Sequence, residues 1–98
     1  MAPSRLATWL SAYASASGGS VDAAKGKTAS IDPPPTSAPF EARVVAAAAL
    51  GAMKDRKRGA EYVHDLLAAG YQHPDLVAAA LALGFHKVEH GKRRPTYE

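Results

Sequence analysis

Apolar residues near the start of the chain repeat with the period of an α-helix. The residues at spacings i, i+3, i+4 and i+7 are Leu6, Trp9, Leu10 and Tyr13. This spacing places them on one side of a helix, so we predict an amphipathic helix over residues 3–16, with Pro3 in its first turn. A helix of this length is marginal in water. Its apolar side must therefore pack on the rest of the chain, on a partner or on a membrane surface.

The next stretch, residues 17–39, shows no apolar period. It contains Gly18-Gly19 and the run Pro33-Pro34-Pro35, which are typical of a flexible joint and of a polyproline II spacer. We interpret these residues as a Gly/Ser/Pro-rich linker. The helix within residues 1–16 is then separate from a domain that spans residues 40–98.

Helical periodicity returns after Phe40 and predicts three helices, over residues 41–55, 60–69 and 74–83. A break at Arg58-Gly59 separates the first two helices. Gly70 closes the second helix, and Pro74 suits the first turn of the third, which ends at Gly84. The turn between the second and third helices is only three residues long, so the pair forms a helix-turn-helix arrangement.

The chain continues with FHKVEHGKRRPTYE, residues 85–98, in which side chains of different character alternate. Gly91-Lys92 fits a two-residue type II′ turn because glycine adopts the positive φ of the first position. This turn pairs His90 with Arg93 and Val88 with Pro95, and a proline is tolerated on an edge strand. We predict a C-terminal β-hairpin and a mainly α fold class, a small three-helix bundle followed by this hairpin.

The order helix, helix, turn, helix, basic hairpin resembles the winged helix-turn-helix family over about residues 40–98. In that family the helix after the turn lies in the DNA major groove, and the hairpin touches the backbone or the minor groove. The resemblance implies that residues 74–83 form the recognition helix and that His90–Arg94 form the wing. This chain departs from the family because its third helix is nearly all Ala, Leu and Val, and the strand usual between the first two helices is not evident.

Positive charge is clustered along the chain. Net charge is +3, and eight of the twelve Lys and Arg residues lie in residues 54–58 and 87–94, which favours a polyanionic partner. We predict a non-enzymatic nucleic-acid-binding module, with DNA favoured, in which phosphate contacts dominate. The candidate contact residues are Lys54, Arg56, Lys57, Arg58, Gln72, His73, Lys87, Lys92, Arg93 and Arg94.

Two alternatives from other classes remain open. A small subunit of a virion, a ribonucleoprotein or a respiratory complex would use the first helix to bind a protein partner or a second copy. Its contact residues would be Leu6, Trp9, Leu10 and Tyr13, since aromatic anchors are enriched at binding hot spots. The stretch of residues 68–85 is also similar to the ubiquitin-associated domain, although that family needs a third helix where this chain has GKRRP.

The sequence gives no sign of catalysis or of a cofactor. It contains no cysteine and nine scattered acidic residues, and no nucleophile motif or phosphate-cradling glycine loop is present. His86 and His90 are about 13 Å apart on a strand, too far to share one metal ion. No apolar run is long enough to span a membrane. We expect an intracellular protein. An organelle is the alternative location, because residues 1–21 lack acidic residues and are similar in composition to a transit peptide.

Overall fold

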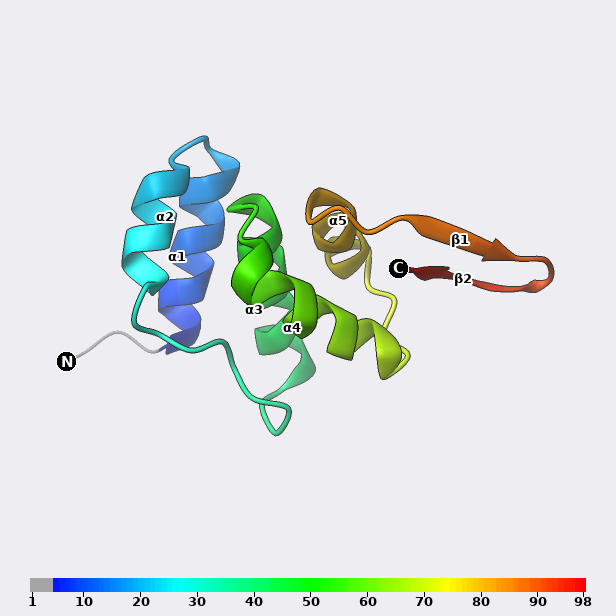
Figure 1. The fold of residues 1–98 in the computed structure, drawn as a ribbon. Helices are drawn as coiled ribbons and strands as arrows, with labels where there is room; N and C mark the ends of the chain where they lie inside the picture. The colour runs from blue at the N-terminus through cyan, green and yellow to red at the C-terminus, as the bar shows by residue number, and fades with distance from the viewer. Residues whose placement is uncertain (1–4) are drawn as a thin grey trace.

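The computed structural model describes residues 5–98, which form five α-helices and a two-stranded antiparallel sheet (Figure 1). The helices are α1 (Arg5–Ser17), α2 (Val21–Thr28), α3 (Phe40–Ala52), α4 (Arg56–Ala68) and α5 (Pro74–Ala82), and the strands are β1 (Lys87–His90) and β2 (Arg93–Tyr97). The predicted mainly α class with a C-terminal hairpin is confirmed. The position predicted for Pro3 lies outside the described residues.

Helix α3 is the centre of the molecule. It packs against α1 on one side and against α4 and α5 on the other (Figure 1). Its run of alanines makes this possible, because small side chains let helices approach closely on more than one side. Ala46 and Ala49 belong to one buried cluster with Trp9, whereas Ala47 belongs to a second cluster with Leu66 and Leu76.

Helix α1 is docked on the body of the protein and is not separate from it. Trp9 is fully buried, together with Ala12 and Ala16. The buried side of α1 therefore follows Trp9 and these two alanines, which leaves Leu6 and Leu10 exposed beside it. The assignment of Trp9 to a partner surface is wrong, because its indole ring already fills the space between α1 and α3.

The segment predicted as a linker contains a helix. Helix α2 runs antiparallel beside α1 (Figure 1) and buries Ala24 and Thr28. Lys27 Nζ donates hydrogen bonds of 3.0 Å to Ser11 Oγ and Ser15 Oγ on α1. The linker interpretation is therefore wrong for Val21–Thr28. This helix is short and polar, and its stability comes from packing on α1, which no local periodicity reveals.

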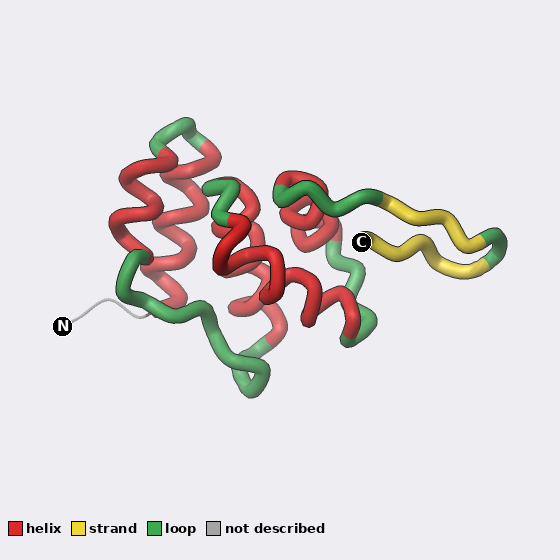
Figure 2. Tube along the Cα trace, in the orientation of Figure 1, coloured by secondary structure: helices red, strands yellow, loops and turns green. Residues whose placement is uncertain are grey.

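The remaining part of the linker crosses the body as an extended loop between α2 and α3 (Figure 2). Trp9 Nε1 donates to the carbonyl of Asp32 at 3.4 Å, and Tyr62 Oη donates to the carbonyl of Pro34 at 2.7 Å. Burial raises the pKa of Tyr62 to about 12, although the positive charge of Arg43 opposes this rise. The phenol therefore stays protonated and keeps donating over the physiological pH range.

Helix α4 begins earlier than predicted and includes Gly59. Asp55 is its N-cap and accepts a hydrogen bond from the backbone N–H of Arg58 at 3.2 Å. The expected break at Arg58-Gly59 is wrong, because Gly59 lies inside α4, where other helices pack closely against it. A Cβ atom at Gly59 would lie 2.9 Å from Leu83 Cδ1 and 3.2 Å from Leu50 Cβ.

Helices α3 and α5 cross closely at Gly51, so a substitution at this glycine tests how the two helices pack. A Cβ atom there would lie 2.6 Å from the Cα atom of Ala79. We expect Gly51→Ala to lower the free energy of unfolding by about 1–3 kcal/mol, because the two helices must move apart. Gly26→Ala is the matched control within α2, since nothing lies within 4 Å of its added Cβ.

The control should raise stability by roughly 0.5–1 kcal/mol through helix propensity. Urea unfolding followed by far-UV circular dichroism measures both variants. Equal changes in the two variants would show that α3 and α5 do not cross at Gly51.

The hairpin has the predicted turn but a shifted register. His90 pairs with Arg93 as predicted, whereas Val88 pairs with Thr96 instead of Pro95. An irregularity between Val88 and His90 places two residues of β2 opposite one residue of β1. We attribute this bulge to Pro95, which has no N–H to donate to the neighbouring strand.

Candidate nucleic-acid interface

The hairpin extends away from the helices, at the opposite end of the molecule from α1 and α2 (Figure 2). Its turn is tight because Gly91 has a φ of 63°, the positive value that a type II′ turn requires at this position. Lys92, Arg93 and Arg94 follow at the tip and are all exposed. Within residues 5–98, none of these three side chains has an ion-pair or hydrogen-bond partner.

The base of the hairpin is tied to the helices. Gln72, in the turn before α5, donates from Nε2 to the carbonyl of Pro95 at 3.0 Å. Lys87 is less available than the tip residues because its Nζ lies 3.3 Å from Glu89 Oε1. The hairpin is thus a supported arm with its unpaired positive charge at the far end.

Helix α5 does not offer the side chains that read DNA bases. The side chains of Asp75, Ala78 and Leu81 are exposed on it, and none of them is a hydrogen-bond donor. His73, at its N-cap, uses Nδ1 to accept a hydrogen bond from the backbone N–H of Asp75 at 3.1 Å. Direct sequence readout in a major groove therefore lacks the residues that it needs on this helix.

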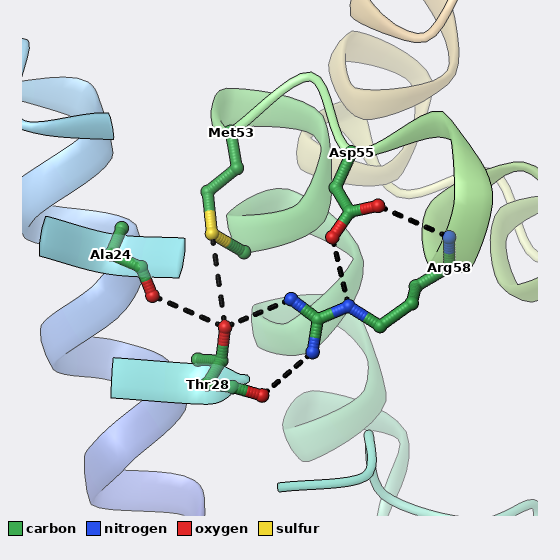
Figure 3. A network of polar contacts seen from close by, with 5 residues as sticks. All are labelled: Ala24, Thr28, Met53, Asp55 and Arg58. Atoms are coloured by element: carbon green, nitrogen blue, oxygen red, sulfur yellow. Dashed lines mark hydrogen bonds and ion pairs between the residues drawn. The ribbon is translucent and has the colours of Figure 1, made fainter. Parts of the chain in front are cut away.

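The basic cluster of residues 54–58 is divided between the fold and the surface. Arg58 belongs to the fold, because its guanidinium donates to the Thr28 carbonyl at 2.7 Å and to Thr28 Oγ1 at 3.0 Å (Figure 3). It also lies 2.8 Å from Asp55 Oδ2 and over the ring of Trp9, 5.6 Å from the ring centre. The assignment of Arg58 to a phosphate contact is wrong, since its donors already join α4 to α2.

Asp55 remains charged through this network. Burial raises the pKa of Asp55, but hydrogen bonds from the side chain and backbone of Arg58, with the positive charges of Arg58 and Lys25, outweigh it. The net effect lowers the pKa of Asp55 below its ordinary value of 3.8. The ion pair therefore stabilises the fold at neutral pH. This stabilisation is lost only as the pH falls through the acidic range and Asp55 is protonated.

Arg58 is expected to differ sharply from its neighbour Lys57. Arg58→Ala removes two hydrogen bonds to the buried Thr28 and the ion-pair partner of Asp55, so we expect a loss of about 2 kcal/mol in the free energy of unfolding. Lys57→Ala, one residue away and exposed, should change it by less than about 0.5 kcal/mol. Chemical denaturation of both variants measures the difference, and equal values would contradict the network.

The other members of this cluster are exposed, and the guanidinium of Arg56 lies beside Gly84, which precedes the hairpin. Lys54 has a positive φ of 54° in the turn between α3 and α4, and Arg56 and Lys57 lie in the first turn of α4. The first turn of α4 lies beside α2, as the hydrogen bond from Arg58 to Thr28 demonstrates. The first turn of α4 thus lies among the helices, whereas Lys92–Arg94 lie at the tip of the hairpin, which extends away from the helices (Figure 1).

The predicted partner residues of α1 are also divided. Leu6 is 39% exposed and Leu10 is 48% exposed, while Tyr13 is half-buried against the core cluster around Trp9. Only the two leucines therefore present substantial apolar surface on this helix. Among the described residues, Leu81 of α5 is the other large apolar side chain with high exposure.

The structure also reveals residues that the sequence did not single out. His64, on α4, and Tyr97, on β2, line the same hollow at the base of the hairpin. They are 33 positions apart (97 − 64), so no local pattern connects them. Within residues 5–98, no group of three His, Asp or Glu side chains could hold a metal ion.

Comparison with known proteins returns no match: no family pattern, no curated protein and no solved structure corresponds to this chain at a significant level. The similarity to winged-helix proteins therefore rests on the order of the elements alone. No helix in the described part of the chain is long and apolar enough to cross a membrane.

Proposed function

We propose that this chain is a non-enzymatic nucleic-acid-binding module that contacts phosphates through its hairpin, with DNA as the first candidate. One observation supports this function above all others. Three consecutive cationic side chains, Lys92–Arg94, lie exposed at the end of an extended arm, and none of them has an ion-pair partner among residues 5–98. The phosphates of a nucleic acid attract such an arm whatever the base sequence, because every nucleotide carries the same backbone charge.

The character of α5 supports non-specific rather than sequence-specific binding. A helix with Asp75, Ala78 and Leu81 on its exposed side gains little from entering a major groove, where bases are read by polar side chains. The negative charge of Asp75 also opposes close approach to phosphates. The hairpin is then the principal contact, and affinity should depend strongly on salt and weakly on sequence.

Fluorescence anisotropy with labelled oligonucleotides tests this function. Single-stranded and duplex DNA and RNA of about 12 nucleotides should bind saturably, and affinity should fall steeply from about 50 mM to about 200 mM salt. Different sequences of one type should bind alike. Absence of binding at low salt, with protein that is folded by circular dichroism, would contradict the proposal.

The exposed leucines of α1 favour a second function, that of a small subunit in a larger assembly. Leu6 and Leu10 are one helical turn apart and together leave an apolar strip on the surface. Such a strip is small, and scattered exposed apolar residues are common in soluble proteins. A folded protein that binds no oligonucleotide but associates with itself in sedimentation experiments would support this second function.

A further inference from the structure

A hollow of about 340 Å³ opens at the base of the hairpin, between α4 and β2. Such a volume is at the lower end of the range for small-molecule sites. The side chains that give it its chemical character are His64, Gln72, His90, Thr96, Tyr97 and Glu98. They come from α4, from the turn before α5 and from the hairpin, so the folded chain alone creates this site.

The hollow has an aromatic wall that is fixed in place. Tyr97 is half-buried and packs against the core cluster around Leu66 and Leu76, and its side chain also lines the hollow. His64 lines it from α4, with its side chain 66% exposed. Flat rings of this kind are the surfaces on which nucleobases stack, whatever their sequence.

Polar side chains on the hairpin side of the hollow are held by hydrogen bonds. Thr96 Oγ1 donates to Glu98 Oε2 at 2.9 Å and lies 2.7 Å from His90 Nε2. Because the hydroxyl proton is directed to Glu98, His90 Nε2 must carry the hydrogen of the second bond. These two hydrogen bonds fix the orientation of the His90 ring beside Thr96.

The hollow is close to the cations of the hairpin. Arg94 and Tyr97 are three positions apart on β2, about 10 Å at the rise of a strand. A nucleic acid whose phosphates contact Arg93 and Arg94 can therefore extend toward the hollow. A duplex keeps its bases stacked inside, so only an unstacked base of a single strand can reach the rings.

We propose that this hollow binds one unstacked nucleobase of a single-stranded nucleic acid whose phosphates contact Arg93 and Arg94. This inference rests on the proposed function and specifies its ligand, a single strand in preference to a duplex. Arg93 and Arg94 supply affinity for the backbone, and Tyr97 with His64 supplies affinity for the base. The two contributions are separable because an abasic strand has the same charge and no base.

The test compares a labelled oligo-deoxyadenylate of about eight nucleotides with an abasic strand of equal length and charge, at one salt concentration. Anisotropy titration of the parent protein should give roughly 5- to 100-fold tighter binding of the strand with bases, the effect of one stacked base. Tyr97→Leu keeps an apolar side chain on the core and should remove most of this preference. Tyr13→Leu, a half-buried tyrosine on α1, should retain it.

His64→Ala provides a second variant that leaves the core intact, since this side chain is exposed, and it should reduce the preference several-fold by removing one wall of the hollow. Equal affinity of the parent for both strands would overturn the base site and leave the phosphate-binding function intact. A preference that survives both variants would also overturn it. Binding of neither strand would reject the base site and the proposed function together.

Discussion

Replacing Trp9 with alanine should cause the largest loss of stability of any single change considered for this protein, about 3–5 kcal/mol in the free energy of unfolding. Trp9 is fully buried between α1 and α3, and its Nε1 hydrogen bond holds the loop at Asp32. A small domain is stable by only about 5–15 kcal/mol in total. The variant should therefore retain little of the packing of α1 and α2 on the rest of the chain.

Leu10→Ala is the matched control, because Leu10 is the next residue of the same helix and is 48% exposed. We expect its free energy of unfolding to change by less than about 1 kcal/mol. Urea unfolding followed by circular dichroism measures both variants, and the parent should show blue-shifted tryptophan emission even at high dilution. Similar losses in the two variants, or a water-like emission in the parent, would mean that α1 is not docked through Trp9.

The sequence predicts the helices of this fold better than their contacts. The periodic spacing of apolar residues identifies α1, α3 and α5 within a few positions, because each has enough apolar residues to repeat. Helix α2 escapes the same reasoning, since its stability depends on the packing of Ala24 and Thr28 against residues distant in the chain. Its Gly and Lys content resembles that of a linker.

Local signals also have more than one physical meaning. Gly59 suggests a helix break, yet it lies within α4, where Leu83 and Leu50 pack closely against it. Pro95 suggests an edge strand, which the structure contains, but the register of the hairpin is also shifted by one residue, and we attribute this shift to the missing N–H of Pro95. In both cases the sequence identifies the position, while the tertiary neighbours determine its role.

The candidate site could be predicted only in part, for a related reason. A basic side chain has the same appearance in the sequence whether it is free or used by the fold. Arg58 is bound to Thr28 and Asp55, whereas Arg93 and Arg94 have no partner among the described residues. Only the three-dimensional neighbours distinguish these two cases.

The second large effect concerns these free arginines. The double variant Arg93→Ala/Arg94→Ala should weaken binding of every oligonucleotide alike, on the order of tens-fold at low salt. Each phosphate that a cation neutralises releases counterions, which contributes about −0.7 to the slope of log affinity against log salt for a single strand. Loss of two contacts should flatten that slope by about 1.4, and by about 1.8 with a duplex. Stability should hardly change, because both side chains are exposed.

The most direct test of phosphate binding through the hairpin is therefore the salt slope of this variant beside that of Arg56→Ala/Lys57→Ala, with a labelled single strand of about eight nucleotides. The control removes the same charge from exposed positions in the first turn of α4, away from the tip of the hairpin. We predict that the hairpin variant loses about 1.4 in slope and that the control keeps the slope of the parent. Equal flattening in both variants, or no measurable binding by the folded parent, would contradict the account.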